Sequence, residues 1–240
     1  MRTCSFALIG LLTFVTSASV QAQMFATPAG AFTSGGNVSA NANFTVANGH
    51  ITLVLTNLFE NPTADSQLLN GITFTVNNAT SSGALATVNS GNISTISSGG
   101  AYSAGISDSL TRWTATETGT SIALTTLSGG KPNDLIIGPD SNNGFDPLKG
   151  SYSNANSSIT VHNPSVLGSA TYNMTVSGVT SASQLSNIVF GFGTTAGSNT
   201  VAGTRFTAPA TPEPGSLAMF AGMMSSGAVF LAFRRKNQKH

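Results

Sequence analysis

Apolar and hydroxyl-bearing residues alternate through the middle of this chain with the period of a β-strand. In residues 51–56 the order Ile-Thr-Leu-Val-Leu-Thr places apolar side chains on one face and mostly threonine on the other. Threonine and valine favour the pleated conformation, and period-2 alternation is typical of a strand with one buried face. Similar runs cover 72–76, 170–176 and 188–192, with weaker ones at 44–46, 84–88, 112–115, 121–127, 158–161 and 201–206.

Clusters of Gly, Asn, Ser and Pro separate these runs, and none of the runs has a sustained helical period. "SGGKPND" and "GPDSNNGFDP" are examples of such turn-forming clusters. One short helical turn is expected near 63–69. Many short strands joined by turns predict an all-β domain, an antiparallel β-sandwich of Greek-key or jelly-roll type, over residues 23–206.

The N-terminus follows a different pattern, because a ten-residue apolar stretch at 6–15 comes soon after Arg2. Small residues then lead to Ala22 and Gln23. A positive start, an apolar stretch and a small-residue cut site are the three parts of a secretory signal peptide, here 1–22. The alternative is an N-terminal core helix. The signal-peptide interpretation makes this an exported protein.

The C-terminus carries a second apolar stretch. Residues 216–233 contain no charge, and as a helix they would reach about 27 Å, close to the bilayer core of about 30 Å. The basic cluster Arg234, Arg235 and Lys236 follows at once, which favours a cytoplasmic tail at 234–240. Residues 207–215 form a Pro-containing linker. The pattern predicts a marginal transmembrane helix that stops transfer.

Pro212, Glu213 and Pro214 lie immediately before this stretch. Two prolines exclude a helix and keep the segment extended. This Pro-Glu-Pro motif, the apolar span and the basic end together resemble the PEP-CTERM sorting signal of Gram-negative bacteria. The resemblance covers about the last thirty residues. It implies processing by a membrane-embedded exosortase and a role beside exopolysaccharide and biofilm. The alternative is a plain anchor with a chance Pro-Glu-Pro.

Charge and cysteine content exclude several classes of function. Charged residues make up 7% of the chain, and between Gln23 and Ala210 there are seven acidic residues against four basic ones. Phosphate binding needs clustered Lys and Arg, so no nucleic-acid partner is expected. Cys4 is the single cysteine and lies in the signal peptide. The mature protein therefore has no thiolate metal site and no cysteine nucleophile.

Asp140, Asn142 and Asp146 are the best candidate ligand set. They supply hard oxygen ligands at alternate positions of one loop, which suits Ca²⁺. The EF-hand pattern fails, because Gly144 stands where an oxygen ligand belongs and no bidentate Glu follows. The alternative is a turn loop in which the acids cap backbone amides. No other cofactor is expected.

Catalytic motifs do not appear in the sequence. His50 and His162 lie far apart and have no companion nucleophile in a recognisable motif. There is no G-x-S-x-G and no H-E-x-x-H. Seven acids leave a glycosidase or lyase pair open by count, but they lie mostly in turn-like surroundings. We expect a protein that is not an enzyme.

Tyr102 and Trp113 could form an aromatic platform for a sugar ring, although a single Trp in a strand is more often a core residue. Taken together, the two sorting segments and the lack of catalytic motifs predict an exported structural or adhesive protein of the cell surface or extracellular matrix, after an inner-membrane-anchored stage. Its partners would be an exosortase, the membrane and an exopolysaccharide. The alternatives are a polysaccharide- or Ca²⁺-binding module and, third, a secreted glycosidase or lyase.

Overall fold

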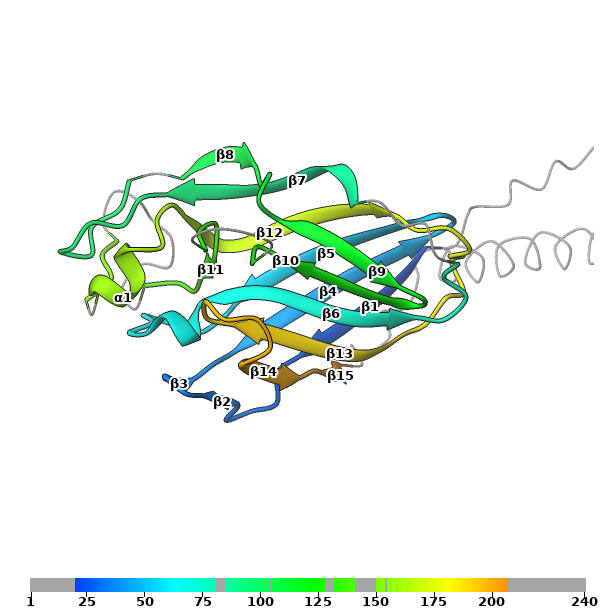
Figure 1. Ribbon diagram of the computed structural model, residues 1–240, viewed down its shortest axis with the longest axis horizontal. Coiled ribbons are helices and arrows are strands. Elements are labelled where there is room, and N and C mark those ends of the chain that lie inside the picture. The colour runs from blue at the N-terminus through cyan, green and yellow to red at the C-terminus, as the bar shows by residue number, and fades with distance from the viewer. Residues whose placement is uncertain are drawn as a thin grey trace, which may run out of the picture. The chain divides into compact units, whose positions relative to one another are not determined.

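The computed structural model describes residues 20–80, 85–103, 105–127, 132–140, 150–153 and 155–206. Contacts divide the chain into two units, 1–206 and 207–240. The described residues belong to the first unit, which is mostly β-strand and predominantly antiparallel. The predicted all-β class is confirmed (Figure 1).

One branch of the sheet lies nearer the viewer in Figure 1. It contains, in order, β9 (Thr114–Thr118), β10 (Ser121–Thr125), β6 (Leu69–Val76), β13 (Leu185–Phe192) and β14 (Asn199–Ala202). All its pairings are antiparallel. The inward side chains of these strands are apolar, as the alternation at 72–76 and 188–192 predicts.

The other branch contains β8 (Ile106–Ser109), β7 (Leu85–Ser94), β12 (Ser165–Thr175), β5 (His50–Asn57), β4 (Ala40–Ala47), β1 (Gln21–Ala26) and β15 (Thr204–Phe206). Its pairings are also antiparallel. β4 and β5 form a two-residue hairpin at Asn48-Gly49, where Gly49 has φ of 75°. Glycine suits a turn that needs positive φ.

The two branches face each other across the main core. The rings of Phe44 in β4 and Phe74 in β6 meet edge to face, with centroids 5.0 Å apart, although their strands are not hydrogen-bonded neighbours. Phe25 in β1 packs edge to face on Phe44 at 6.0 Å. These three side chains are at most 4% exposed. Edge-to-face aromatic pairs stabilise such a core beyond the area they bury.

Short strands link the branches at two places. β11 (Ile136–Ile137) pairs with β6 on one side and, in parallel, with β12 on the other. β14 and β15 are separated by Gly203 alone, so one strand leaves the first branch and joins the second. A Cβ at Gly203 would lie 2.9 Å from the ring of Phe190, which explains why glycine stands there. The last described strand thus ties both branches together.

A second, smaller core lies at one end of the domain. It contains Leu68, Ile96, Tyr102, Leu135, Ile137, Tyr152, Ile159 and Leu167. The short elements η1 (Asp65–Gln67), α1 (Ser157–Thr160), β2 (Phe32–Thr33) and β3 (Gly36–Asn37) complete the described chain. The helical turn expected near 63–69 is confirmed as η1.

The weak strand predicted at 158–161 is wrong, because these residues belong mainly to α1. The side chain of Asn156 accepts a hydrogen bond from Ser158 N–H at 2.8 Å and caps the helix. Only Ile159 of the turn is buried. The Asn156 cap therefore favours a helical turn here, although the β-branched residues of the segment favour a strand.

Candidate functional site

Asp140 is the one member of the predicted calcium set that the structure describes. Its side chain is 2% exposed, and the Tyr102 hydroxyl donates a hydrogen bond to Oδ2 at 2.9 Å. Asn142 and Asp146 lie outside the described residues. Among the residues that are described, no group of three or more His, Cys, Asp or Glu could hold a metal ion. The three-ligand calcium site stays a prediction.

Tyr102 and Trp113 lie in different cores. Tyr102 is 6% exposed and packs against Tyr152 with ring centroids 5.3 Å apart. Trp113 is 2% exposed, packs against Tyr172 at 5.0 Å, and donates its indole N–H to the carbonyl oxygen of Asp134 at 2.9 Å. This burial favours the core interpretation over a shared platform for a sugar.

Burial changes the acid–base properties of the groups around Trp113. Desolvation raises the pKa of Asp134, the nearby Arg112 opposes that rise, and Asp108 adds to it. The Arg112 guanidinium is 4.0 Å from the Asp134 carboxylate. Burial likewise raises the pKa of Tyr172, with a smaller contribution from Asp134. These groups lie at the boundary of the main core.

The two histidines do not meet in a site. His50 is exposed at the start of β5, where its ladder partners are Ala47 and Thr175. His162 is half-buried, and its Nδ1 lies 2.9 Å from the carbonyl oxygen of Pro132. Neither belongs to a cluster of potential metal ligands in the described part of the chain.

The predicted processing sites lie at or beyond the ends of the described domain. Ala22 and Gln23 are inside β1, where they pair with Thr45 and Phe44. The motif Pro212 to Pro214, the span 216–233 and the basic cluster Arg234 to Lys236 lie outside the described residues. Within the described ranges, no helix has the length and apolar character needed to cross a bilayer.

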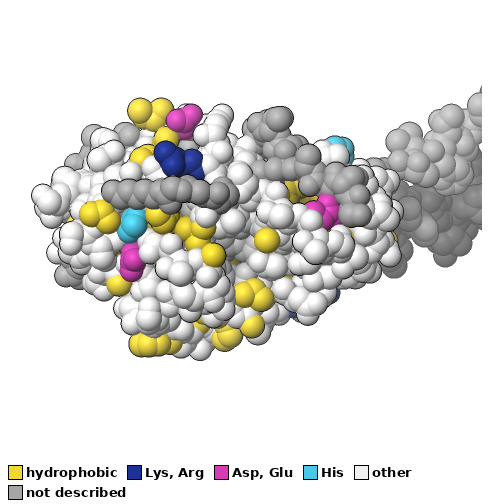
Figure 2. Space-filling model, in the orientation of Figure 1, with side chains coloured by type: hydrophobic (Ala, Val, Ile, Leu, Met, Phe, Trp, Pro, Cys, Tyr) yellow, Lys and Arg dark blue, Asp and Glu magenta, His cyan; other side chains and the backbone are white. Residues whose placement is uncertain are grey.

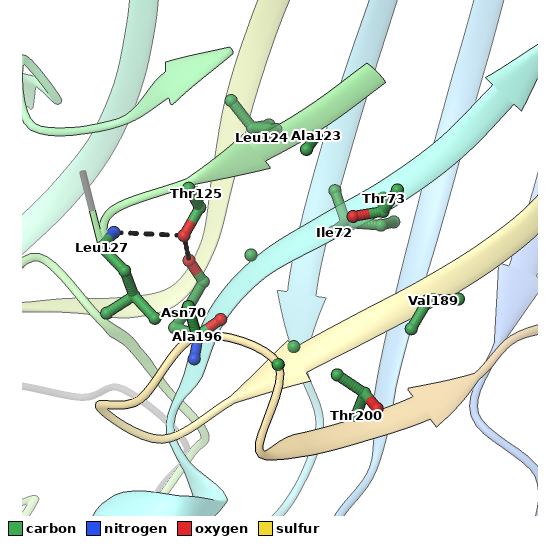
Figure 3. Close-up of a pocket in the computed structure, with 13 residues that line it drawn as sticks. Asn70, Ile72, Thr73, Ala123, Leu124, Thr125, Leu127, Val189, Ala196 and Thr200 are labelled. Atoms are coloured by element: carbon green, nitrogen blue, oxygen red, sulfur yellow. Dashed lines mark hydrogen bonds between the residues drawn. The ribbon is translucent and has the colours of Figure 1, made fainter. Parts of the chain in front are cut away.

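A groove of about 200 Å³ opens on the outer face of the first branch. It lies over β10, β6, β13 and β14, and part of the loop between β13 and β14 forms one wall (Figure 3). Its lining residues are Asn70, Gly71, Ile72, Thr73, Ala123, Leu124, Thr125, Leu127, Val189, Gly191, Ala196, Gly197 and Thr200. The groove lining is mostly apolar, and none of these residues carries a charge.

Glycines make the floor of the groove. Gly71 and Gly191 are cross-strand partners, and the ladder continues to Thr125 on one side and Thr200 on the other. A Cβ at Gly191 would lie 2.6 Å from Asn70 Oδ1, so that amide oxygen occupies the space above the glycine. Glycine inside a strand often marks a place where another group approaches the backbone closely.

Three polar groups of the groove are available to a ligand. Asn70 is 5% exposed, and its Nδ2 donates to the carbonyl oxygen of Gly193 at 2.8 Å. Its Oδ1 accepts no hydrogen bond from the described residues, and the hydroxyls of Thr73 and Thr200 likewise form none. The Thr125 hydroxyl is already used, since it donates to the Asn70 carbonyl and accepts from Leu127 N–H.

The described outward residues of the strands around the groove are uncharged as well. The other outward residues of β9, β10, β6 and β14 are Thr114, Thr116, Thr118, Ser121, Thr75 and Ala202. Figure 2 shows this side of the molecule as mostly uncharged, with a few separate charged side chains. The sequence did not indicate the groove: Gly191 lies inside the 188–192 run and Gly71 just before the 72–76 run, but only the structure shows that these two glycines are cross-strand partners.

No protein-family model, curated protein or solved structure matches this chain.

Proposed function

We propose that this chain is an exported, non-enzymatic protein that is sorted through a PEP-CTERM-type tail to the cell surface or extracellular matrix. There it has a structural or adhesive role. The observation that carries the proposal is the pairing of β1 with β15, which brings the two ends of the described domain together. Met24 is the ladder partner of Phe206, and the strands are antiparallel.

The consequence of that pairing is topological. In an antiparallel pair, the start of one strand and the end of the other lie at the same end of the ladder. The signal peptide predicted before Gln23 and the linker predicted after Phe206 therefore both join the domain there. A domain whose two chain ends leave side by side suits a precursor attached to one membrane through both predicted segments.

The fold supports a display role in a second way. We propose that the two facing branches form a β-sandwich of Greek-key or jelly-roll type. Connections such as β5 to β6 and β12 to β13 pass from one branch to the other. The outward side chains of β4 and β5 are Asn, Thr, Val, Ala and His. This face carries amides and hydroxyls and no carboxylate, ammonium or guanidinium group.

The experiment is mass spectrometry of the mature C-terminus in cells with and without the exosortase. We expect a chain shortened near Pro212 to Pro214 only where the enzyme is present. The variant Glu213→Ala should stay in the membrane fraction, and Glu60→Ala, an exposed glutamate of the domain, should be released normally. An intact chain ending at His240 in both strains would overturn the proposal.

A further inference from the structure

We propose that the groove over β6, β10, β13 and β14 binds a sugar residue of an uncharged polysaccharide. The inference rests on the proposed function, since it needs a polysaccharide outside the cell. It is carried by the groove itself: a backbone floor, an apolar wall and three unused polar groups.

The lack of charge among the lining residues indicates the charge of the ligand. None of the thirteen lining residues is ionised, and the surrounding outward residues of these strands are threonine, serine and alanine. An anionic polymer gains affinity from clustered Lys and Arg, and the described residues that line the groove include neither. A cationic ligand would similarly find no carboxylate among these lining residues. The groove therefore fits a neutral ligand.

The three polar groups of the groove indicate that the neutral ligand carries hydroxyl groups. Asn70 lines the groove, and its Oδ1 accepts no hydrogen bond from the described residues, so this oxygen can accept one from a ligand. A ligand hydroxyl placed beside this oxygen would donate to it. The Thr73 and Thr200 hydroxyls flank this position along and across the strands, and each can donate or accept. A ligand carrying several hydroxyls can satisfy all three.

The apolar part of the lining fits the carbon-bearing face of a sugar ring. Val189, Ala196 and Leu127 provide apolar surface for the C–H face of a ring. Sugars combine such a face with hydroxyl edges. A purely apolar side chain would leave Asn70 Oδ1 without a donor, so the geometry favours a sugar over a hydrophobic peptide.

Affinity electrophoresis of the exported protein, purified as the cell releases it, tests the inference. Native gels would contain dextran or hydroxyethyl cellulose as neutral probes and alginate as the anionic probe. We expect retardation by at least one neutral polymer and none by alginate. Thr200→Phe should fill the groove and abolish retardation, while Thr116→Phe, exposed on β9 of the same face, should leave it unchanged.

A second pair of variants tests the hydroxyls without filling the space. Thr73→Val keeps the shape of the side chain and should weaken binding about tenfold, the effect of losing one hydrogen bond to the ligand. Thr118→Val, outside the groove, is its control.

No retardation in either neutral gel, retardation by alginate alone, or equal retardation of Thr200→Phe and the wild type would each overturn the inference. A protein that is correctly processed at its tail yet shows one of these results refutes the groove and leaves the sorting proposal standing.

Discussion

The side-chain amide of Gln23 donates a hydrogen bond to the carbonyl oxygen of Ser183 at 2.8 Å, joining the first long strand to the approach to β13. The same amide accepts from the N–H of Leu185 at 3.0 Å. Gln23 is 1% exposed. A buried glutamine thus satisfies two backbone groups of the opposite branch.

Gln23→Ala should lower the free energy of unfolding by about 1–3 kcal/mol, because it leaves a buried carbonyl and a buried N–H without partners. Urea denaturation measures the change. Gln184→Ala is the matched control: that side chain is half-buried and bonds to Gln21, Ala182 and Arg205 near the surface, and its loss should change stability by no more than about 0.5 kcal/mol. Equal unfolding midpoints for wild type and Gln23→Ala would contradict the assignment.

The same two bonds predict how a processed N-terminus behaves. A glutamine freed at the N-terminus cyclises when its α-amine attacks the side-chain carbonyl carbon and ammonia leaves. In the folded protein cut before Gln23, the amide is held by Ser183 and Leu185 and has to be released first. Intact-mass measurements should show slow loss of ammonia from the folded protein and faster loss in urea. Equal rates in both conditions would show that the amide is not held.

Trp113 should behave as a core residue. Trp113→Phe retains a ring against Tyr172 but leaves the Asp134 carbonyl without its donor, and we expect a loss of about 1–2 kcal/mol. Trp113→Ala should cost about 3–5 kcal/mol through the cavity it creates. Thermal unfolding measures both. Retardation by a neutral polysaccharide should not change in Trp113→Phe; a selective loss of retardation in a stable variant would restore the aromatic-platform interpretation.

Asp134 predicts a pH dependence of stability. Burial raises its pKa above the ordinary 3.8, so the folded state holds the proton more tightly than the unfolded chain. The stability linked to this group is therefore fully present below pH 3.8 and is lost as pH rises through the folded pKa. Asp134→Asn removes this dependence and suits the backbone, because φ at this position is 58° and Asn tolerates such values.

Urea denaturation of wild type and Asp134→Asn at a series of pH values checks this prediction. The advantage of the variant should grow as pH rises from 3.8 toward neutrality, less any loss from the Arg112 contact. An advantage that shrinks with rising pH would mean that the Arg112 attraction outweighs desolvation.

The sequence predicted those strands whose burial pattern alternates cleanly. Residues 51–56 lie in β5 and 72–76 in β6, and each buries every second side chain. β1 escaped prediction because a glutamine occupies one of its buried positions and its start overlaps the expected signal peptide. β8 has no buried face, and β11 has only two residues, so neither could show a period.

The groove could not be predicted for a different reason. Its floor joins Gly71 to Gly191, residues 120 positions apart whose pairing depends on the order of the strands. Alternation identifies which side of a strand faces out, but not which strands become neighbours. The buried state of Tyr102 and Trp113 likewise depended on packing, which no local pattern encodes.

The short β15 has a mechanical consequence. Its register on β1 has only three pairs, at Met24, Phe25 and Ala26, and Gly203 connects it to β14. If the protein is tethered through its C-terminal tail, tension enters at Phe206 and reaches these pairs before any longer strand. Under such tension β15 would separate from β1 first. This would expose the edge of β1 while the aromatic core stays packed. Shear stress on a surface layer could in this way turn an anchored domain into one with an open edge for a neighbour's strand.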